Sequence, residues 1–279
     1  PVQAVIVNSG IANACTGAEG FGYCKDTARA AAEALKISED GVLIGSTGVI
    51  GKQIPIDRLT AGIRVLAKEK NDTTENGTAA ARAIMTTDTC EKELAVTIEV
   101  GGKTVTIGGM AKGSGMIHPN MCTMLAFITT DAVIAKEVLQ SALSEDVQDT
   151  YNMISVDGDT STNDTVVLLA NGLAENPEIV YGSEDYHRFK EALHAVNEYL
   201  AKKIAGDGEG ATALFEVRAA GCESIEQART LAKSIVCSNL TKTAIAGHDA
   251  NWGRILCAMG YYGAQFDSEK VDLFFESKA

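Results

Sequence analysis

The hydrophobic pattern of the first seventy residues changes three times. Residues 2–10 form an apolar run that ends in a polar turn, and residues 41–52 hold a second short apolar run that enters a glycine-rich turn. Such runs are typical of buried strands. Residues 25–36 and 56–69 instead repeat apolar side chains every three or four positions, the spacing of one helix face. The chain is therefore predicted to begin as strand, helix, strand, helix.

Later segments predict a mixture of strands and helices. Residues 94–109 alternate strictly around Gly101 and Gly102, which indicates an antiparallel hairpin with a two-residue turn. Ser224, followed three positions later by Gln227, predicts a capped helix. The remaining expected elements are strands at 124–131, 165–172 and 213–219 and helices at about 133–153 and 184–205. This order favours a layered α/β or α+β fold with mixed sheets flanked by helices.

Composition narrows the class of function. The formal net charge is −13, so the chain offers no basic surface for nucleic acid or an anionic membrane. No apolar run approaches the roughly 18 residues that span a bilayer. Seven cysteines without regular spacing predict reduced thiols and a cytoplasmic location. Small-molecule chemistry fits these features, and the opening strand at Pro1 suggests a start inside a longer gene product.

Three motifs resemble ligand sites but lack their essential residues. Residues 45–52 place five residues between Gly45 and Gly51, whereas a phosphate-binding loop needs four. The loop at 157–165 lacks the glycine and the final glutamate of a calcium site. The four histidines form no zinc pattern. No metal site is predicted, although the turn "GSTG" is suited to binding an anion or oxyanion through its backbone N–H groups.

A different chemistry is indicated by "GSGMIHPNMCTMLAFITTDA" at residues 113–132. A threonine hydroxyl is a weak nucleophile unless a base takes its proton. If the peptide bond before Thr123 breaks, the new α-amine, with a pKa near 8, supplies that base. Gly113, Gly115 and Pro119 provide the turn that such a cleavage needs. The alternative is that Thr123 only begins a strand.

Seven motifs, in order from residue 8 to about 256, resemble the ornithine acetyltransferase family of arginine biosynthesis, some of whose members are also glutamate N-acetyltransferases. They are "NSGIANACTG", "GSTGVIG", "AIMTTDT", "AKGSGMIHPNMCTMLAFITTDA", "VDGDTSTNDTV", "DGEGAT" and "NWGRIL".

The resemblance implies a self-processing N-terminal-nucleophile sandwich of the ornithine acetyltransferase and DmpA-like kind. Cleavage between Cys122 and Thr123 would give an α chain (1–122) and a β chain (123–279), the latter shorter at its C-terminus than in the family. Cys122 stands where the family usually has alanine, and His118 stands where alanine is common.

The resemblance also implies residue roles. Thr123 becomes the nucleophile that carries acetyl, and Thr47 and Gly48 become the oxyanion pair. Thr86, Lys112, Thr123 and Glu209 become the substrate-binding residues.

The implied reaction moves acetyl from N-acetylornithine to glutamate, with acetyl-CoA as a possible second donor and without metal or bound cofactor. The implied assembly is an α2β2 heterotetramer. Two alternatives stay open: a self-cleaving amidase or aminopeptidase that uses water as acceptor, and an uncleaved binding protein for amino-acid ligands.

Overall fold

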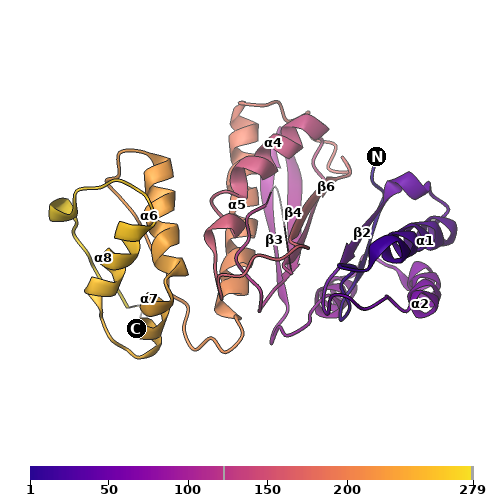
Figure 1. The fold of residues 1–279 in the computed structure, drawn as a ribbon. Helices are drawn as coiled ribbons and strands as arrows, with labels where there is room; N and C mark the ends of the chain where they lie inside the picture. Colours follow the sequence, from indigo (N-terminus) through magenta and orange to yellow (C-terminus); the bar gives the residue numbers. More distant parts are fainter. Residues whose placement is uncertain (122, 278–279) are drawn as a thin grey trace.

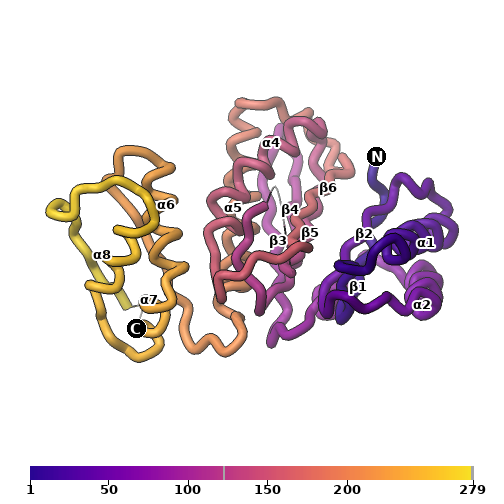
Figure 2. The backbone as a smooth tube through the Cα atoms, in the orientation of Figure 1, coloured from indigo at the N-terminus to yellow at the C-terminus, as the bar shows by residue number. Residues whose placement is uncertain are grey.

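The computed structural model describes residues 1–121 and 123–277. Figures 1 and 2 show a chain that runs from an indigo α/β unit through a central sheet to a yellow group of helices. The strands are β1 (Ala4–Asn8), β2 (Val42–Ser46), β3 (Lys92–Val100), β4 (Lys103–Lys112), β5 (Leu125–Thr130) and β6 (Thr165–Ala170). The helices are α1 (Gly17–Leu35), α2 (Ile56–Glu69), α3 (Thr74–Ala83), α4 (Lys136–Asp146), α5 (Glu184–Gly206), α6 (Ile225–Cys237), α7 (Asn239–Ala246) and α8 (Trp252–Tyr261).

The strands form two sheets. β1 and β2 pair in parallel, as the strand–helix–strand pattern of the sequence predicts. The other sheet has the order β3-β4-β5-β6, in which β5 pairs antiparallel with β4 and parallel with β6. Gly101 and Gly102 join β3 to β4 with φ angles of 57° and 78°, and this confirms the expected hairpin. The mixed α/β class predicted from the sequence is thus confirmed.

Apolar side chains on both faces of β1 and β5 pack the two sheets and their helices into layers. Ala4 and Ile6 pack with the alanines of α1, whereas Val5 and Val7 lie on the opposite face, with Phe127 of β5. Odd and even positions of a strand point to opposite faces, so the other face of β5, carrying Ala126 and Ile128, packs on α5. The order is therefore helix, sheet, sheet, helix.

The last helices, α6 to α8, form a separate cluster beyond α5 (Figure 1). Leu231 and Met259 lie at its centre. It contacts the central unit through Lys233, whose Nζ donates to the carbonyl oxygens of Asn152 (2.6 Å) and Ile154 (2.8 Å).

Three expectations need correction. Residues 213–219 form no strand in the described backbone, because no neighbouring strand pairs with them; Phe215 and Val217 pack on α6 and α8 instead. Helix α1 begins at Gly17 rather than 25, since the glycines of its first turns obscure the helical pattern. The helix expected over 133–153 ends at Asp146 and is followed by a separate short turn, Tyr151–Met153.

The predicted cap of α6 is confirmed, because Ser224 Oγ accepts a bond from the Gln227 N–H at 3.1 Å. Among the described helices, none combines the length and the apolar character that a membrane span requires.

Candidate active site

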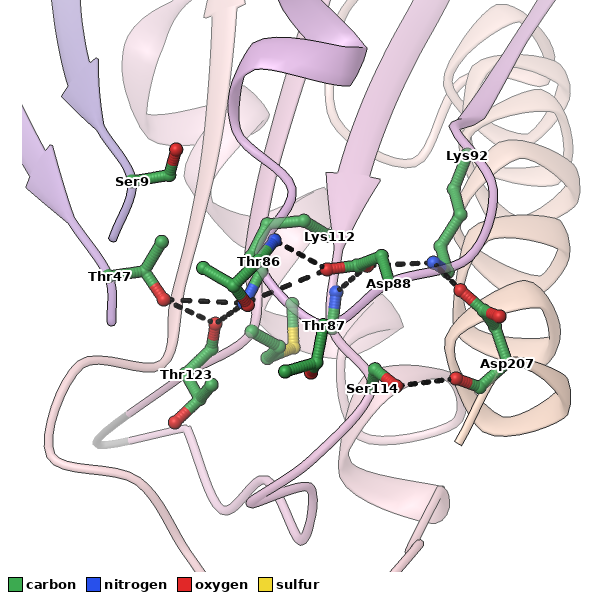
Figure 3. A network of polar contacts seen from close by, with 12 residues as sticks. Ser9, Thr47, Thr86, Thr87, Asp88, Lys92, Lys112, Ser114, Thr123 and Asp207 are labelled. Atoms are coloured by element: carbon green, nitrogen blue, oxygen red, sulfur yellow. Dashed lines mark hydrogen bonds and ion pairs between the residues drawn. The ribbon is translucent and has the colours of Figure 1, made fainter. Parts of the chain in front are cut away.

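The predicted catalytic residues meet where five strands begin or end. β1, β2 and β4 end here, while β5 and β6 begin here, so side chains from both sheets converge (Figure 3). Thr47 directly follows β2, Lys112 is the last residue of β4, and Thr123 lies two residues before β5. The stacking of the two sheets is therefore what brings residues 76 positions apart into contact.

The carbonyl oxygen of Thr123 is held by two donors. Thr47 Oγ1 and Lys112 Nζ both lie 3.2 Å from it. Figure 3 shows that this carbonyl faces Thr47, whereas the Thr123 hydroxyl points away from that group. The structure thus fixes the backbone of the proposed nucleophile and leaves its hydroxyl directed toward the opposite side.

Lys112 is a fully buried cation among neutral oxygens. Its Nζ donates to Thr86 Oγ1 (2.9 Å), to Thr47 Oγ1 (3.3 Å) and to the Thr123 carbonyl (3.2 Å). Asp88, at 4.0 Å, provides a neighbouring carboxylate. Burial lowers the pKa of Lys112, and attraction to Asp88 opposes that effect. Thr86 is exposed, so one hydrogen bond links the buried Lys112 to a surface residue.

A buried ionic network supports Lys112 from behind, and the sequence analysis did not find it. Lys92 Nζ lies 2.7 Å from Asp88 and 2.6 Å from Asp207. Burial raises the pKa of Asp88, but the bonds from Lys92 and from the backbone N–H groups of Gly113 and Thr86 outweigh it, so the net pKa is lowered. Asp88 therefore stays ionised and ties β3 to the end of β4.

The turn after β2 positions the expected oxyanion pair. Thr47 N donates to the Asn8 carbonyl and Val49 N to the Gly10 carbonyl, each at 3.1 Å, and the N–H of Gly48 takes no part in this set of bonds. Gly48 has a φ of 128°, and a Cβ there would lie 2.2 Å from the carbonyl carbon of Gly10. Only glycine fits this turn, which directly follows the buried Thr47.

Glu209 lies at the edge of the group. Its Oε1 accepts a bond from Thr87 Oγ1 at 2.6 Å, and its backbone N donates to the Ser114 carbonyl at 3.1 Å. A Cβ on Gly115 would lie 2.4 Å from the same Oε1. The glycine thus makes room for an exposed carboxylate that faces the site.

Asp164, which the sequence analysis passed over, contacts the backbone of the nucleophile. Its Oδ1 accepts the N–H groups of Thr123 (2.7 Å) and Met124 (2.9 Å). Its Oδ2 is buried and has no hydrogen-bond partner among the described residues. Burial raises the pKa of Asp164, although hydrogen bonds from the backbone N–H groups of Met124, Thr123 and Ser161 oppose the rise.

The turn before Thr123 is held from the same loop. Asp157 accepts the N–H groups of Met116 (2.6 Å) and Ile117 (3.0 Å), and Asn152 accepts that of Met121 (2.9 Å). Met116 adopts a φ of 55°, a strained conformation for a side chain of this type. The strained and well-held turn expected from the sequence is present at residues 116–121, before the proposed cleavage position.

The proposed cleavage position is only half described. Thr123 lies in the structure, whereas Cys122 lies outside the described residues. Among the described part of the chain, no group of three or more histidine, cysteine or acidic side chains has the arrangement of a metal site.

Comparison with known proteins shows the family of this chain. The family model described as "ArgJ family" matches residues 1–279. The chain belongs to the ArgJ family. Its sequence is 56% identical over 273 residues to the "Arginine biosynthesis bifunctional protein ArgJ" of Symbiobacterium thermophilum, which covers 98% of this chain and 67% of that relative. It is 52% identical over 272 residues to the Listeria monocytogenes protein of the same name, again covering 98% and 67%.

A solved structure is also similar to this ArgJ-family chain. The crystal structure of the arginine biosynthesis bifunctional protein argJ from Bacillus halodurans matches with a TM-score of 0.50 and 53% sequence identity, covering 51% of this chain and 67% of that one. The chain spans about two thirds of the length of the two curated relatives. The resemblance that the seven motifs indicate is thereby confirmed, and so is an enzymatic role in arginine biosynthesis.

Proposed function

We propose that this chain carries the nucleophile of an acetyltransferase that moves acetyl from N-acetylornithine to glutamate through Thr123. The arrangement that carries the proposal is the pair of donors, Thr47 Oγ1 and Lys112 Nζ, each 3.2 Å from the Thr123 carbonyl, with Asp164 2.7 Å from the Thr123 nitrogen. Family membership supplies the pathway, since the relatives are arginine biosynthesis proteins.

Self-cleavage before Thr123 creates the base. The product chains are 1–122 and 123–279, and the second begins with a free α-amine whose pKa near 8 suits proton transfer close to neutrality. The helix–sheet–sheet–helix order supports a sandwich of the N-terminal-nucleophile kind, because Leu125 at the start of β5 faces the sheet formed by β1 and β2.

The first half-reaction acylates the enzyme. Thr123 Oγ attacks the acetyl carbonyl carbon while its proton passes to the α-amine. The Thr47 hydroxyl and the Gly48 N–H stabilise the oxyanion, and one such donor contributes roughly 2.7–4 kcal/mol to the transition state. The ornithine nitrogen then leaves with the proton from the α-ammonium, and acetyl remains as an ester on Thr123.

The second half-reaction returns the enzyme to its start. The glutamate amine attacks the ester carbonyl, loses a proton to the α-amine, and departs as N-acetylglutamate, while Thr123 Oγ regains its hydrogen. No metal or bound cofactor enters either half. Acetyl-CoA as an additional donor and an α2β2 assembly of the cleaved chains belong to the same proposal.

Two charges suit the two ends of the amino-acid substrate. Lys112 acts with Thr86 at the carboxylate end, while the exposed Glu209 carboxylate faces the side-chain ammonium of ornithine. Glutamate brings no ammonium to that end, so Glu209 should favour the donor over the acceptor.

The test follows cleavage and transfer together. Intact-mass analysis of the expressed protein should give two chains, one beginning at Thr123, and incubation with N-acetylornithine and glutamate should give N-acetylglutamate with no free acetate. Free acetate in place of N-acetylglutamate would instead support the amidase alternative. A single uncut chain that binds amino acids would support the binding-protein alternative.

A further inference from the structure

Asp164 contacts the one backbone nitrogen that changes its chemistry during self-cleavage. Oδ1 lies 2.7 Å from Thr123 N, which is the amide nitrogen of the bond to residue 122 and later the α-amine. The neighbouring Met124 N–H bonds to the same oxygen at 2.9 Å. One carboxyl group thus remains beside this nitrogen before and after the cut.

The second carboxyl oxygen of Asp164, Oδ2, is buried and has no hydrogen-bond partner among the described residues, so it can carry a hydrogen. Burial raises the pKa of Asp164, which favours the protonated form. The backbone N–H groups of Thr123, Met124 and Ser161 and the positive charge of Lys112 oppose the rise.

We propose that Asp164 is a catalytic residue that donates a proton to the Thr123 nitrogen during self-cleavage and then serves as the counter-charge of the α-amine during acetyl transfer. This inference rests on the proposed function, because both steps require Thr123 to be the nucleophile.

The cleavage step balances without another reactant. Thr123 Oγ forms a bond to the carbonyl carbon of residue 122 as that carbon's bond to Thr123 N breaks. The nitrogen gains the hydrogen of the Asp164 carboxyl group, and the carboxylate recovers the hydrogen of the hydroxyl, directly or through one water molecule. Water then hydrolyses the ester, which restores the hydroxyl and leaves a carboxylate on residue 122.

The same contact acts in acetyl transfer. When the α-amine takes the Thr123 hydroxyl proton it becomes an ammonium group beside the Asp164 carboxylate. An opposite charge at this distance favours the charged form of the amine. The carboxylate therefore raises the pKa of the α-amine and stabilises the ion pair formed in the transition state.

If Asp164 had only a structural role, the chemical nature of its side chain would matter less. Accepting two N–H groups at the start of β5 requires only an oxygen, which asparagine supplies equally well. Asp164→Asn separates the two roles, because it keeps the acceptor and removes the transferable proton and the charge. Asp159→Asn in the same loop is the matched control, since Asp159 is exposed and contributes only its backbone N–H to a described bond.

The experiment follows self-cleavage of the whole chain, synthesised in a cell-free reaction at low temperature and then warmed. Intact-mass analysis over a series of pH values gives the rate of appearance of the chain that begins at Thr123. Asp164→Asn should cleave about 10²–10⁴-fold more slowly than wild type, as expected when a general acid is removed. The wild-type cleavage rate should fall as pH rises, because Asp164 loses the proton that it donates. The rate of Asp164→Asn should not fall in this way, and Asp159→Asn should cleave as wild type does.

Two further measurements keep the inference falsifiable. Any processed Asp164→Asn protein should show the acidic limb of its kcat–pH profile at lower pH than wild type, because its α-amine has lost the counter-charge. If Asp164→Asn does not fold, the pH dependence of wild-type cleavage is the test. A wild-type cleavage rate that does not decline as pH rises would overturn the inference. So would Asp164→Asn cleaving with the wild-type rate and pH profile.

The controls separate this inference from the proposed function. Wild-type cleavage together with an uncut Thr123→Ala chain supports the proposed nucleophile whatever Asp164 does. An uncut wild-type chain would overturn both.

Discussion

The Nζ atom of Lys112 lies 3.3 Å from Oγ1 of Thr47, and the two side chains share the carbonyl oxygen of Thr123. A buried cation that donates to a hydroxyl makes that hydroxyl a better donor, because each hydrogen bond polarises the next in a low-dielectric environment. Under the proposed function, the fully buried Lys112 should therefore act on the reaction through Thr47 as well as through any contact with substrate.

Removing the Thr47 hydroxyl should impair transfer more than binding. Thr47→Val keeps the shape of the side chain and should lower kcat about 10²–10³-fold with little change in KM, since the donor acts on the oxyanion. Thr47→Ser should retain most of the activity. Steady-state kinetics with N-acetylornithine as the varied substrate distinguish the two variants, and equal losses in both would show that the hydroxyl is not the donor.

The Asp88–Lys92 ion pair should make the free energy of unfolding fall in acid. The folded pKa of Asp88 lies below its unfolded value, so its contribution is present above about pH 4 and is lost as pH falls through the folded pKa. Asp88→Asn leaves the buried Lys92 with the Asp207 carboxylate and the Cys90 carbonyl oxygen, and should cost about 3–5 kcal/mol at pH 7.

Urea unfolding of wild type and Asp88→Asn at pH 7 and at a series of pH values below about 4 tests this expectation. The difference between the two proteins should shrink as the pH is lowered. The exposed Asp72→Asn is the control and should match wild type throughout. A constant difference between wild type and Asp88→Asn would contradict the assignment.

Gly115→Ala should displace the Glu209 carboxylate. The new Cβ would lie 2.4 Å from Oε1, and the flexible glutamate can swing away, at the expense of its 2.6 Å bond to Thr87. We expect KM for N-acetylornithine to rise roughly 10–100-fold, the equivalent of one hydrogen bond to a charged group, with little loss of stability.

Gly62→Ala is the control for that substitution. Gly62 lies in α2 with no atom within 4 Å of the added Cβ. The variant should keep KM and gain about 0.5–1 kcal/mol of stability. An unchanged KM in Gly115→Ala would remove Glu209 from donor binding.

Some of these residues could be predicted from the sequence and others could not. Thr47, Lys112 and Thr123 lie in motifs whose residue types indicate their chemistry, and the structure brings all three into contact. Asp164 gave no comparable signal, because its partners are backbone N–H groups about 40 positions away. Spacing in the sequence carries no information about such a contact until the order of β5 and β6 is known.

The fold also has parts that the sequence predicts and parts that it does not. Strict alternation identified the β3–β4 hairpin, since each residue pairs with a near neighbour in the chain. Residues 213–219 also alternate but form no strand, because a strand needs a partner that the sequence pattern does not specify. The layering of the two sheets likewise depends on contacts such as Val7 with Phe127, which lie far apart in the chain.

Lys233 should make stability rise at alkaline pH. Burial lowers its pKa to about 8, against roughly 10.4 in the unfolded chain. Between these values the unfolded chain binds a proton that the folded chain lacks, so the free energy of unfolding rises with pH by up to about 3 kcal/mol. Below pH 8 the group is charged in both states and adds no pH dependence.

Urea unfolding of Lys233→Met between pH 7 and 10.5 checks this effect. The rise attributed to Lys233 should disappear from the variant. The exposed Lys136→Met should keep it. Parallel curves for wild type and Lys233→Met would show that Lys233 titrates normally.

The most direct measurement of the central claim is the mass of the chain that begins at Thr123 after brief exposure to N-acetylornithine without glutamate. The account predicts a gain equal to one acetyl group, localised to Thr123 by peptide mapping and lost when glutamate is added with the formation of N-acetylglutamate. The alkali sensitivity of the adduct would identify the ester. Acetyl transfer from N-acetylornithine to glutamate with no acetylated Thr123, or transfer by a Thr123→Ala protein, would contradict the account.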